Sequence, residues 1–397
     1  MNYLTRLLTF LLLAPPALSF VILPPTHQQA PLSATSSLDD DDNTLRLLSF
    51  SPTDQRWLPE SHKLELKRQK QNFIDITDHQ DLPLLLHATS LTGGGKPWVA
   101  PPLPPAPVFS KVIHPILKNL TTTTMHTNLN KLTSFHTRYY KSSTGRSSSE
   151  WLQGLIHETC PDLRITRFAH PWPQSSLIAA IPGRTNNTVI VSAHQDSINL
   201  FLPSLLGAPG ADDDGSGTVT ILEALRAICT SELYDVSKGI FENTIEFHWY
   251  SAEEGGLLGS QAVYSSYARE GRQVIAMLQQ DMTGFTKRTI AAGLPPSVAV
   301  ITDFVDPTLT DFIKKVVETY ADIPWTESKC GYACSDHASA GRAGYRSAFV
   351  IESLFELSNQ DIHTTEDKVE RLDFDHMKEF AKVAVGVALE LGMAKLE

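Results

Sequence analysis

From Val112 to the C-terminus, short apolar runs alternate with stretches whose apolar residues recur at helical spacing. The runs expected to be strands are SLIAAIPG, TVIVSAH, NTIEFHWYSAEE, VIAMLQQDMTG, SVAVITD and RSAFVIES. Strands that are apolar on both faces are typical of a sheet covered by helices on both sides. The alternation therefore predicts an α/β fold, a three-layer α/β/α sandwich with a mainly parallel, mixed central sheet.

Helices are expected between and around these strands. Residues 116–132 and 147–157 are predicted to be helical before the first strand, and residues 375–396 to form a closing helix. No internal repeat is visible, so we expect a single domain over residues 82–397.

The N-terminus has the features of a secretory signal peptide. Arg6 supplies a positive start, residues 7–13 form a short apolar run, and small residues occur near Ser19. A membrane anchor is the alternative, but this run is shorter than the roughly 20 apolar residues that span a bilayer. We predict a signal peptide over residues 1–19, a secreted, extracellular protein and no membrane association.

Residues 20–81 differ in composition from the rest of the chain. They begin as a polar, poorly periodic stretch and continue into a charged segment, ESHKLELKRQKQNFIDITDH, for which we expect one amphipathic helix. This pattern predicts a pro-segment that assists folding and blocks the site until it is removed. Its end is not determined by the sequence and could extend to about residue 108, because a Gly- and Pro-rich stretch follows.

Charge and modification signals agree with export. The net charge of −11 argues against a nucleic-acid partner, because no basic surplus is available for phosphates. Asn119 and Asn186 each begin a glycosylation sequon.

The cysteines number four. A turn could bring Cys330 and Cys334 within disulfide distance, and we expect that bridge in an oxidising compartment. A CxxxC zinc knuckle is the rival interpretation. No role is predicted for Cys160 and Cys229.

Polar residues of ligand type follow several of the predicted strands. They are His194 and Asp196, the triple aspartate at 212–214, Glu253 and Glu254, Asp281, and His363. Each has an ordinary alternative as a hydrogen-bonded histidine, a solvated glutamate or a helix cap. Together they would crowd carboxylates at one edge of the sheet, which is repulsive unless a cation is bound there. A mixed set of histidine and carboxylate ligands suits zinc.

The motifs HQDS, APGADDDGSG, YSAEEGGLLGS, QQDMTG, CGYACSDHAS and IHTTED occur in this order. In these motifs the chain resembles the co-catalytic dinuclear-zinc aminopeptidases, particularly the secreted leucyl aminopeptidases of bacteria and filamentous fungi. The similarity runs from about Val112 to the C-terminus, and it implies a fold of the zinc-exopeptidase type.

The resemblance implies two zinc ions per monomer. His194 and Asp281 would bind one ion, Glu254 and His363 the other, and Asp213 would bridge them. Such a bridging aspartate is followed by a cis peptide in that family. Glu253 matches the general base, and Asp196 matches the carboxylate that orients the ligand histidine.

The resemblance also implies the substrate site. Tyr332 corresponds to a contact with the substrate and with the oxygen that becomes negative. The apolar pocket would be lined by Met282, Phe349, Ile351, Phe355 and Ile362. Ser358 departs from the family, where an aromatic residue is frequent, and could widen the pocket.

The implied function is that of a secreted metalloexopeptidase, a zinc-dependent aminopeptidase. It would release N-terminal amino acids, preferentially leucine and other hydrophobic residues, from peptides with a free N-terminus, and we expect a monomer. The alternatives on the same fold are a carboxypeptidase, a mononuclear-zinc glutaminyl cyclase, or a non-catalytic binding relative.

Overall fold

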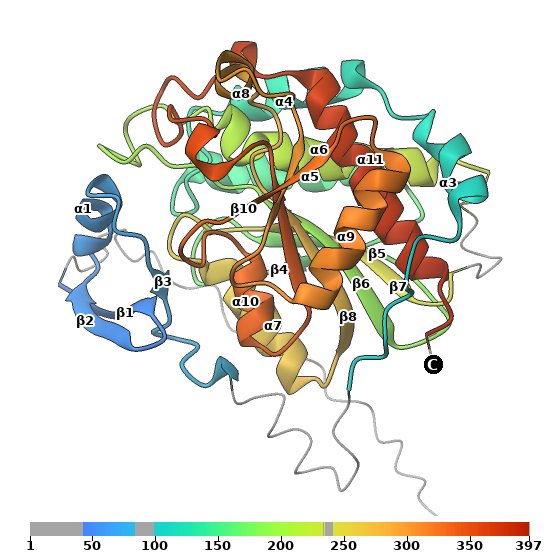
Figure 1. The fold of residues 1–397 in the computed structure, drawn as a ribbon. Helices are drawn as coiled ribbons and strands as arrows, with labels where there is room; N and C mark the ends of the chain where they lie inside the picture. The colour runs from blue at the N-terminus through green and yellow to red at the C-terminus, as the bar shows by residue number, and fades with distance from the viewer. Residues whose placement is uncertain (1–42, 84–98, 233, 235–240, 397) are drawn as a thin grey trace, which may run out of the picture. The chain divides into compact units, whose positions relative to one another are not determined.

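The central sheet has eight strands in the order β10-β9-β11-β8-β6-β7-β5-β4 (Figure 1). The structure is a computed structural model that describes residues 43–83, 99–232, 234 and 241–396. The strands are β4 Arg164–Phe168, β5 Ser176–Ile181, β6 Asn187–His194, β7 Thr244–Tyr250, β8 Gln273–Gln280, β9 Val298–Ile301, β10 Trp325–Ser328 and β11 Ser347–Ile351. The neighbours β11, β8, β6 and β7 run parallel, whereas β5 and β4 on one side and β9 on the other pair antiparallel. The predicted mixed, mainly parallel sheet is confirmed.

Helices cover both faces of this sheet (Figure 1). Val189 and Val191 of β6 pack into a large apolar core with residues of α6 Gly217–Cys229, α9 Pro307–Tyr320 and α11 Phe374–Met393. Ile190, which points to the other face, packs with residues of α7 Leu258–Arg269 and α10 His337–Arg342. Successive side chains of one strand thus enter two different cores, as the predicted three layers require.

The first helices differ from the prediction. Residues 116–132 form parts of two helices, α3 Ser110–Leu117 and α4 Thr122–Thr133, and α5 Ser143–Thr159 is longer than predicted. Thr121 separates the first two because its backbone is extended and its side chain accepts a hydrogen bond from the N–H of Thr123. This N-cap starts a new helix. The remaining short helical elements are α8 Lys287–Ala291, η1 Ala211–Ser216, η3 Phe355–Leu357 and η4 Val369–Arg371.

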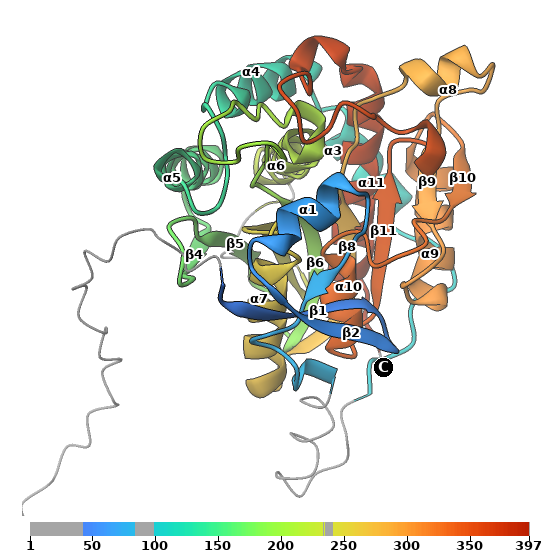
Figure 2. The same cartoon turned by 90° about the vertical axis from the view of Figure 1, so that its left-hand side faces the viewer.

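The described part of the predicted pro-segment, residues 43–81, contains three strands in addition to a helix (Figure 2). A small sheet of order β2-β1-β3 is formed by β1 Leu45–Ser51, β2 Asp54–Pro59 and β3 Ile74–Asp75, with α1 His62–Arg68 between β2 and β3. The expectation of one amphipathic helix was therefore incomplete. Leu47 and Ile74 pack with Leu257 and Ala338 of the larger part of the chain, so tertiary contacts stabilise strands that lack a strong local pattern.

Two disulfide bonds join the four cysteines. Cys330 pairs with Cys334, as expected, so the zinc-knuckle interpretation is wrong. Cys160 pairs with Cys229, 69 residues away, and links the C-terminal ends of α5 and α6.

Some sequence predictions concern residues that the structure does not describe. The predicted signal peptide, residues 1–19, and residues 20–42 of the predicted pro-segment lie outside the described residues. Among the helices of the described ranges, none has both the length and the apolar character needed to cross a membrane.

Candidate active site

The carboxyl ends of β11, β8, β6 and β7 bring the predicted ligand residues to one edge of the central sheet. His194 is the last residue of β6, Asp281 follows β8 directly, and Glu254 lies in the loop after β7. His363 lies on the loop after β11, and Asp213 lies in the turn that precedes α6. These strands are parallel neighbours, so their carboxyl ends meet at the same edge.

Asp213 lies between two histidines. Its Oδ1 is 3.1 Å from Nε2 of His194, and its Oδ2 is 2.9 Å from Nε2 of His363. The Nε2 atom of each histidine faces one further carboxylate. Oδ1 of Asp281 is 3.6 Å from Nε2 of His194, and Oε1 of Glu254 is 3.1 Å from Nε2 of His363. The five side chains therefore form two groups that share the carboxylate of Asp213.

Several atoms of these groups have no hydrogen-bond partner within the described residues. They are both ring nitrogens of His194, Oε1 of Glu254 and Oδ1 of Asp281, and all three side chains are buried. A buried polar atom without a partner is costly. Atoms left in this state where two ligand groups meet favour a bound cation, and their mixture of imidazole nitrogen and carboxylate oxygen fits zinc.

Asp214 competes with Asp213 as a ligand candidate. Ligand atoms of Asp213, Glu254 and His363 lie within 4.8 Å of one another, and the second such group contains Asp214 beside His194 and Asp281. The carboxylate of Asp214 is already engaged, because Oδ2 accepts a hydrogen bond from the N–H of His194 and Oδ1 accepts one from the N–H of Met282. We therefore interpret Asp214 as the group that holds the ends of β6 and β8.

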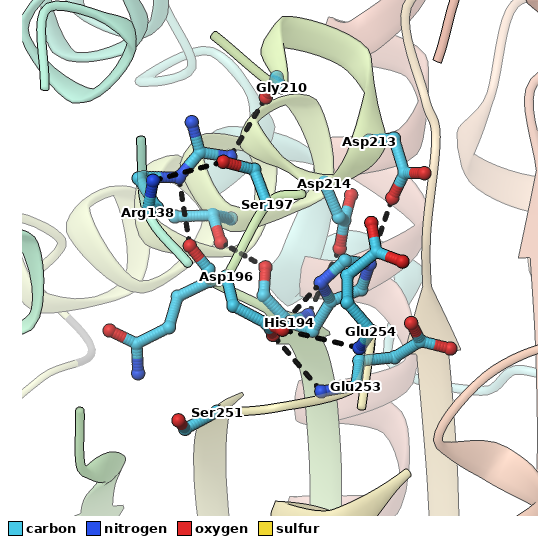
Figure 3. A network of polar contacts seen from close by, with 12 residues as sticks. Arg138, His194, Asp196, Ser197, Gly210, Asp213, Asp214, Ser251, Glu253 and Glu254 are labelled. Atoms are coloured by element: carbon cyan, nitrogen blue, oxygen red, sulfur yellow. Dashed lines mark hydrogen bonds and ion pairs between the residues drawn. The ribbon is translucent and has the colours of Figure 1, made fainter. Parts of the chain in front are cut away.

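The peptide bond between Asp213 and Asp214 is cis, as the resemblance implied. Figure 3 shows both aspartates beside His194, with Asp214 closer to the backbone of β6.

The carboxylates of the site have pKa values that move in opposite directions. Burial raises the pKa of Asp281, and the nearby His194 only partly offsets this. Burial would also raise the pKa of Asp213, but its contacts with His194 and His363 outweigh burial and lower the pKa. The carboxylate between the two histidines is thus the one best suited to stay ionised without a metal.

Asp196 holds the loop that carries both glutamates (Figure 3). Its Oδ1 accepts a hydrogen bond from the N–H of Glu253, and its Oδ2 accepts one from the N–H of Glu254. The same carboxylate lies 3.4 Å from Nδ1 of His194. Asp196 is therefore placed to orient a ligand histidine and the two glutamates together.

Glu253 belongs to neither ligand group but lines the cavity onto which Asp213, Glu254 and His363 open. Burial raises its pKa well above the ordinary value, and the neighbouring Glu254 adds to this, whereas His194 and Lys67 act against it. A carboxyl group with a raised pKa beside a possible metal site is suited to accept and return a proton.

Two residues that sequence reasoning missed support the aspartate turn. Asp367 accepts hydrogen bonds from the N–H groups of Asp212 and Asp213, and so ties the turn to the loop that carries His363. Arg138 is fully buried and donates to the carbonyl oxygens of Gln195, Pro209 and Gly210. Asp367 stands in the motif IHTTED and could have been noticed there, whereas no sequence signal marks Arg138.

An adjoining cavity of about 330 Å³ contains the predicted substrate residues. Those that line it are Tyr332, Met282, Phe349, Ile351, Phe355 and Ile362. Cys334 of the disulfide and Ser358 also line it. Its volume is typical of a small-molecule binding site, for which the range is about 300–1,000 Å³.

The N-terminal segment (residues 43–83) supplies further lining residues that were not predicted. Lys67, Arg68, Lys70, Asn72 and Phe73 face the same cavity. The basic stretch KLELKRQKQ contains three of them, but nothing in its local pattern indicates this contact.

The glycosylation sites stay predictions. Asn186 is exposed and Asn119 is half-buried, just before the N-cap of α4.

Comparison with known proteins gives consistent results. Residues 176–388 match peptidase family M28. Leucine aminopeptidase 1 of Chaetomium globosum is 57% identical over 350 residues, which cover 87% of this chain and 84% of that protein.

Solved structures show the same fold. The LapA aminopeptidase of Legionella pneumophila aligns with a TM-score of 0.72 at 26% identity, over 88% of this chain and 99% of that chain. The glutaminyl cyclase of Porphyromonas gingivalis aligns with a TM-score of 0.54 at 16% identity, over 68% of this chain and 97% of that chain. The second likeness extends to the fold alone.

Proposed function

The chain belongs to peptidase family M28, and from this premise we propose that it is a zinc-dependent aminopeptidase acting on peptides with a free N-terminus. The resemblance drawn from the sequence motifs is thereby confirmed, as is the enzyme class, a hydrolase of peptide bonds. We further propose a preference for leucine and other hydrophobic N-terminal residues, which the name of the 57% identical relative supports.

The observation that carries the proposal is the position of Asp213. Its two carboxylate oxygens face two different histidines, each with a second carboxylate beside it. In the proposed centre His194 and Asp281 would bind one zinc ion, Glu254 and His363 the other, and Asp213 both. When bound, such ions would supply a water of lowered pKa and polarise a carbonyl group.

The chain's own residues then divide the work. Glu253 would accept the proton of the attacking water and deliver it to the leaving amine, and Asp196 would hold Glu253 in place through its backbone N–H. The hydroxyl of Tyr332, which lines the cavity, would donate a hydrogen bond to the oxygen on which negative charge develops.

The apolar wall of the cavity supports the proposed preference. Met282, Phe349 and Ile351 pack with one another, and Phe355 and Ile362 pack against them. An apolar wall of this kind gains only about 1–3 kcal/mol per methylene, so the preference should be broad.

A one-zinc glutaminyl cyclase is less supported. The structural likeness to such an enzyme extends to the fold alone, and the chain has a complete pair of ligand candidates on each side of Asp213. A non-catalytic relative would have no need for Glu253.

Secretion and maturation belong to the same proposal. The signal-peptide pattern of residues 1–19 and the sequons support a secreted glycoprotein, and the N-terminal segment lining the cavity supports a zymogen. Residues 20–81 would then be the part removed, leaving a monomeric enzyme.

The function can be tested on secreted, processed protein by replacing Glu253→Gln and measuring zinc content and Leu-p-nitroanilide hydrolysis. We expect kcat to fall by about 10²–10⁴, the typical contribution of a general base, with zinc content unchanged. Glu158→Gln, on the exposed side of α5, is the matched control and should leave both unchanged.

Chelation should abolish hydrolysis by the wild type, and added zinc should restore it. Retained activity in Glu253→Gln would contradict the assigned base. One zinc ion per chain, with cyclisation of N-terminal glutamine, would favour the cyclase instead.

A further inference from the structure

Lys67 reaches from the N-terminal segment into the candidate active site. Its Nζ lies 2.7 Å from Oε2 of Glu254, and the two side chains are 13% and 1% exposed. Oε1 of the same carboxylate faces His363. A buried ammonium from a residue 187 positions away therefore pairs with a proposed ligand.

One anchor of the N-terminal segment is the loop that carries the two glutamates. The N–H of Asp75 donates to the carbonyl oxygen of Gly256, 3.1 Å away, and Nε2 of Gln261 donates to the carbonyl oxygen of Asp75. Gly256 has a φ of +104°, and a Cβ there would lie 2.8 Å from the nitrogen of Asp75. The close approach of the segment thus depends on a glycine two residues after Glu254.

A second anchor lies on the opposite flank of Lys67. Arg68 donates from Nε to the carbonyl oxygen of Leu200 and from Nη2 to that of Phe201. The N–H of Leu200 in turn donates to the carbonyl oxygen of His363. Lys67 is therefore held between the loop of Glu254 and a loop bonded to His363.

We propose that Lys67 is an internal competitor of the substrate, whose ammonium occupies at Glu254 the place that the α-ammonium of a peptide would take. The inference rests on the proposed aminopeptidase function and specifies its regulation. Both groups are primary ammonium ions, and a buried carboxylate binds either through the same charge-assisted hydrogen bond. A free peptide N-terminus can reach Glu254 only after Lys67 has left.

Inhibition through the ion pair between Lys67 and Glu254 can be distinguished from simple steric blocking of the cavity by the N-terminal segment. Lys70 lines the same cavity from the same segment, but the described residues include no ion pair for it. Lys67→Met keeps the apolar stem and removes the charge, and Lys70→Met makes the same change without touching Glu254. Lys67→Arg keeps the charge and tests whether the ammonium itself is needed.

The experiment uses the full-length, zinc-loaded protein and the probe isopentylamine, which carries the leucine side chain on a primary amine and has no bond to cleave. We expect Lys67→Met to bind the amine at least about tenfold more tightly than the wild type, the effect of one charge-assisted hydrogen bond. Titration calorimetry should show no change for Lys70→Met and little for Lys67→Arg. The kcat/KM for Leu-p-nitroanilide should rise in parallel.

Two results would overturn the inference. In the first, Lys67→Met binds the amine as weakly as the wild type, but proteolytic removal of the N-terminal segment from the folded chain restores binding. The segment would then block the cavity sterically, with no role for the ammonium of Lys67. If zinc content rises in Lys67→Met, the lysine displaces metal and not the amine. Failure of the proposed function would look different, because the chain freed of its segment would then cleave no aminoacyl substrate.

Discussion

Two groups of buried carboxylates in this molecule have their charge balanced in different ways. In the N-terminal segment, Nζ of Lys63 lies 2.6 Å from Oδ2 of Asp75 and 3.0 Å from Oε2 of Glu60, and Arg46 also contacts Glu60. At the carboxyl edge of the central sheet, Asp213 and its neighbours face histidines and one another, and Lys67 of the N-terminal segment pairs with Glu254. The first group is neutralised by Lys63 and Arg46 of the same segment and by Lys141 of the larger part of the chain.

The pKa values express this difference. Burial would raise the pKa of Glu60, but Lys63 and Lys141 outweigh it and lower the pKa to about 2. Burial raises the pKa of Asp281, and the nearby His194 only partly offsets this increase. Carboxylates paired with lysine or arginine have their charge balanced within the chain, whereas carboxylates left short of positive charge are suited to bind a cation.

The largest effect should come from removing the shared carboxylate. Asp213→Asn is expected to lower bound zinc and to reduce kcat/KM by more than the about 10–100-fold that partners of metal ligands cost. Zinc content and Leu-p-nitroanilide hydrolysis check this. Asp75→Asn, in the paired group, should leave zinc content unchanged, and equal zinc loss in both variants would break the comparison.

A smaller effect is expected from acid on the N-terminal segment. The pKa of Glu60 is lower in the folded chain, from an ordinary 4.5 to about 2, so its ion pairs stabilise the segment above pH 4.5. This contribution, at most about 3 kcal/mol, is lost as the pH falls from 4.5 to 2. Hydrogen exchange of β1 amides, referenced to β6, should show protection falling in that window.

Glu60→Gln is the matched control for this pH dependence. The variant should have lower protection of β1 already at pH 6 and little further change on acidification. Wild-type protection that is constant from pH 6 to 2 would show that these ion pairs do not hold the segment.

The smallest effect concerns the apolar wall of the cavity. Ser358 lines the cavity and its hydroxyl donates to the carbonyl oxygen of Phe355. Ser358→Phe should narrow the pocket and lower kcat/KM for phenylalanyl relative to leucyl substrates by about tenfold. Ser358→Ala should change the ratio little, and an unchanged ratio in Ser358→Phe would place the side chain of the substrate elsewhere.

The sequence allowed the sheet and the candidate ligands to be predicted together. Each central strand is a short apolar run, and the ligand-type residues stand at or just after the ends of these runs, as His194 and Asp281 do. The order of the motifs then indicated the family, which the match to peptidase family M28 confirms.

Other features were beyond local patterns. The helix predicted over residues 116–132 is divided by the cap at Thr121, and β1 and β3 escaped notice because docking on Leu257 and Ala338 stabilises them. The Cys160–Cys229 pairing and the buried position of Arg138 depend on how distant helices and loops pack.

The sequence by itself determined the fold class, the peptidase family and the residues that could bind metal, because strand and helix periodicity and short motifs act over a few neighbouring residues. Only the tertiary structure decided which charges meet. It placed Asp213 between two histidines and Lys67 on Glu254, since such contacts join residues far apart in the chain and exist only after the sheet, its loops and the N-terminal segment have packed.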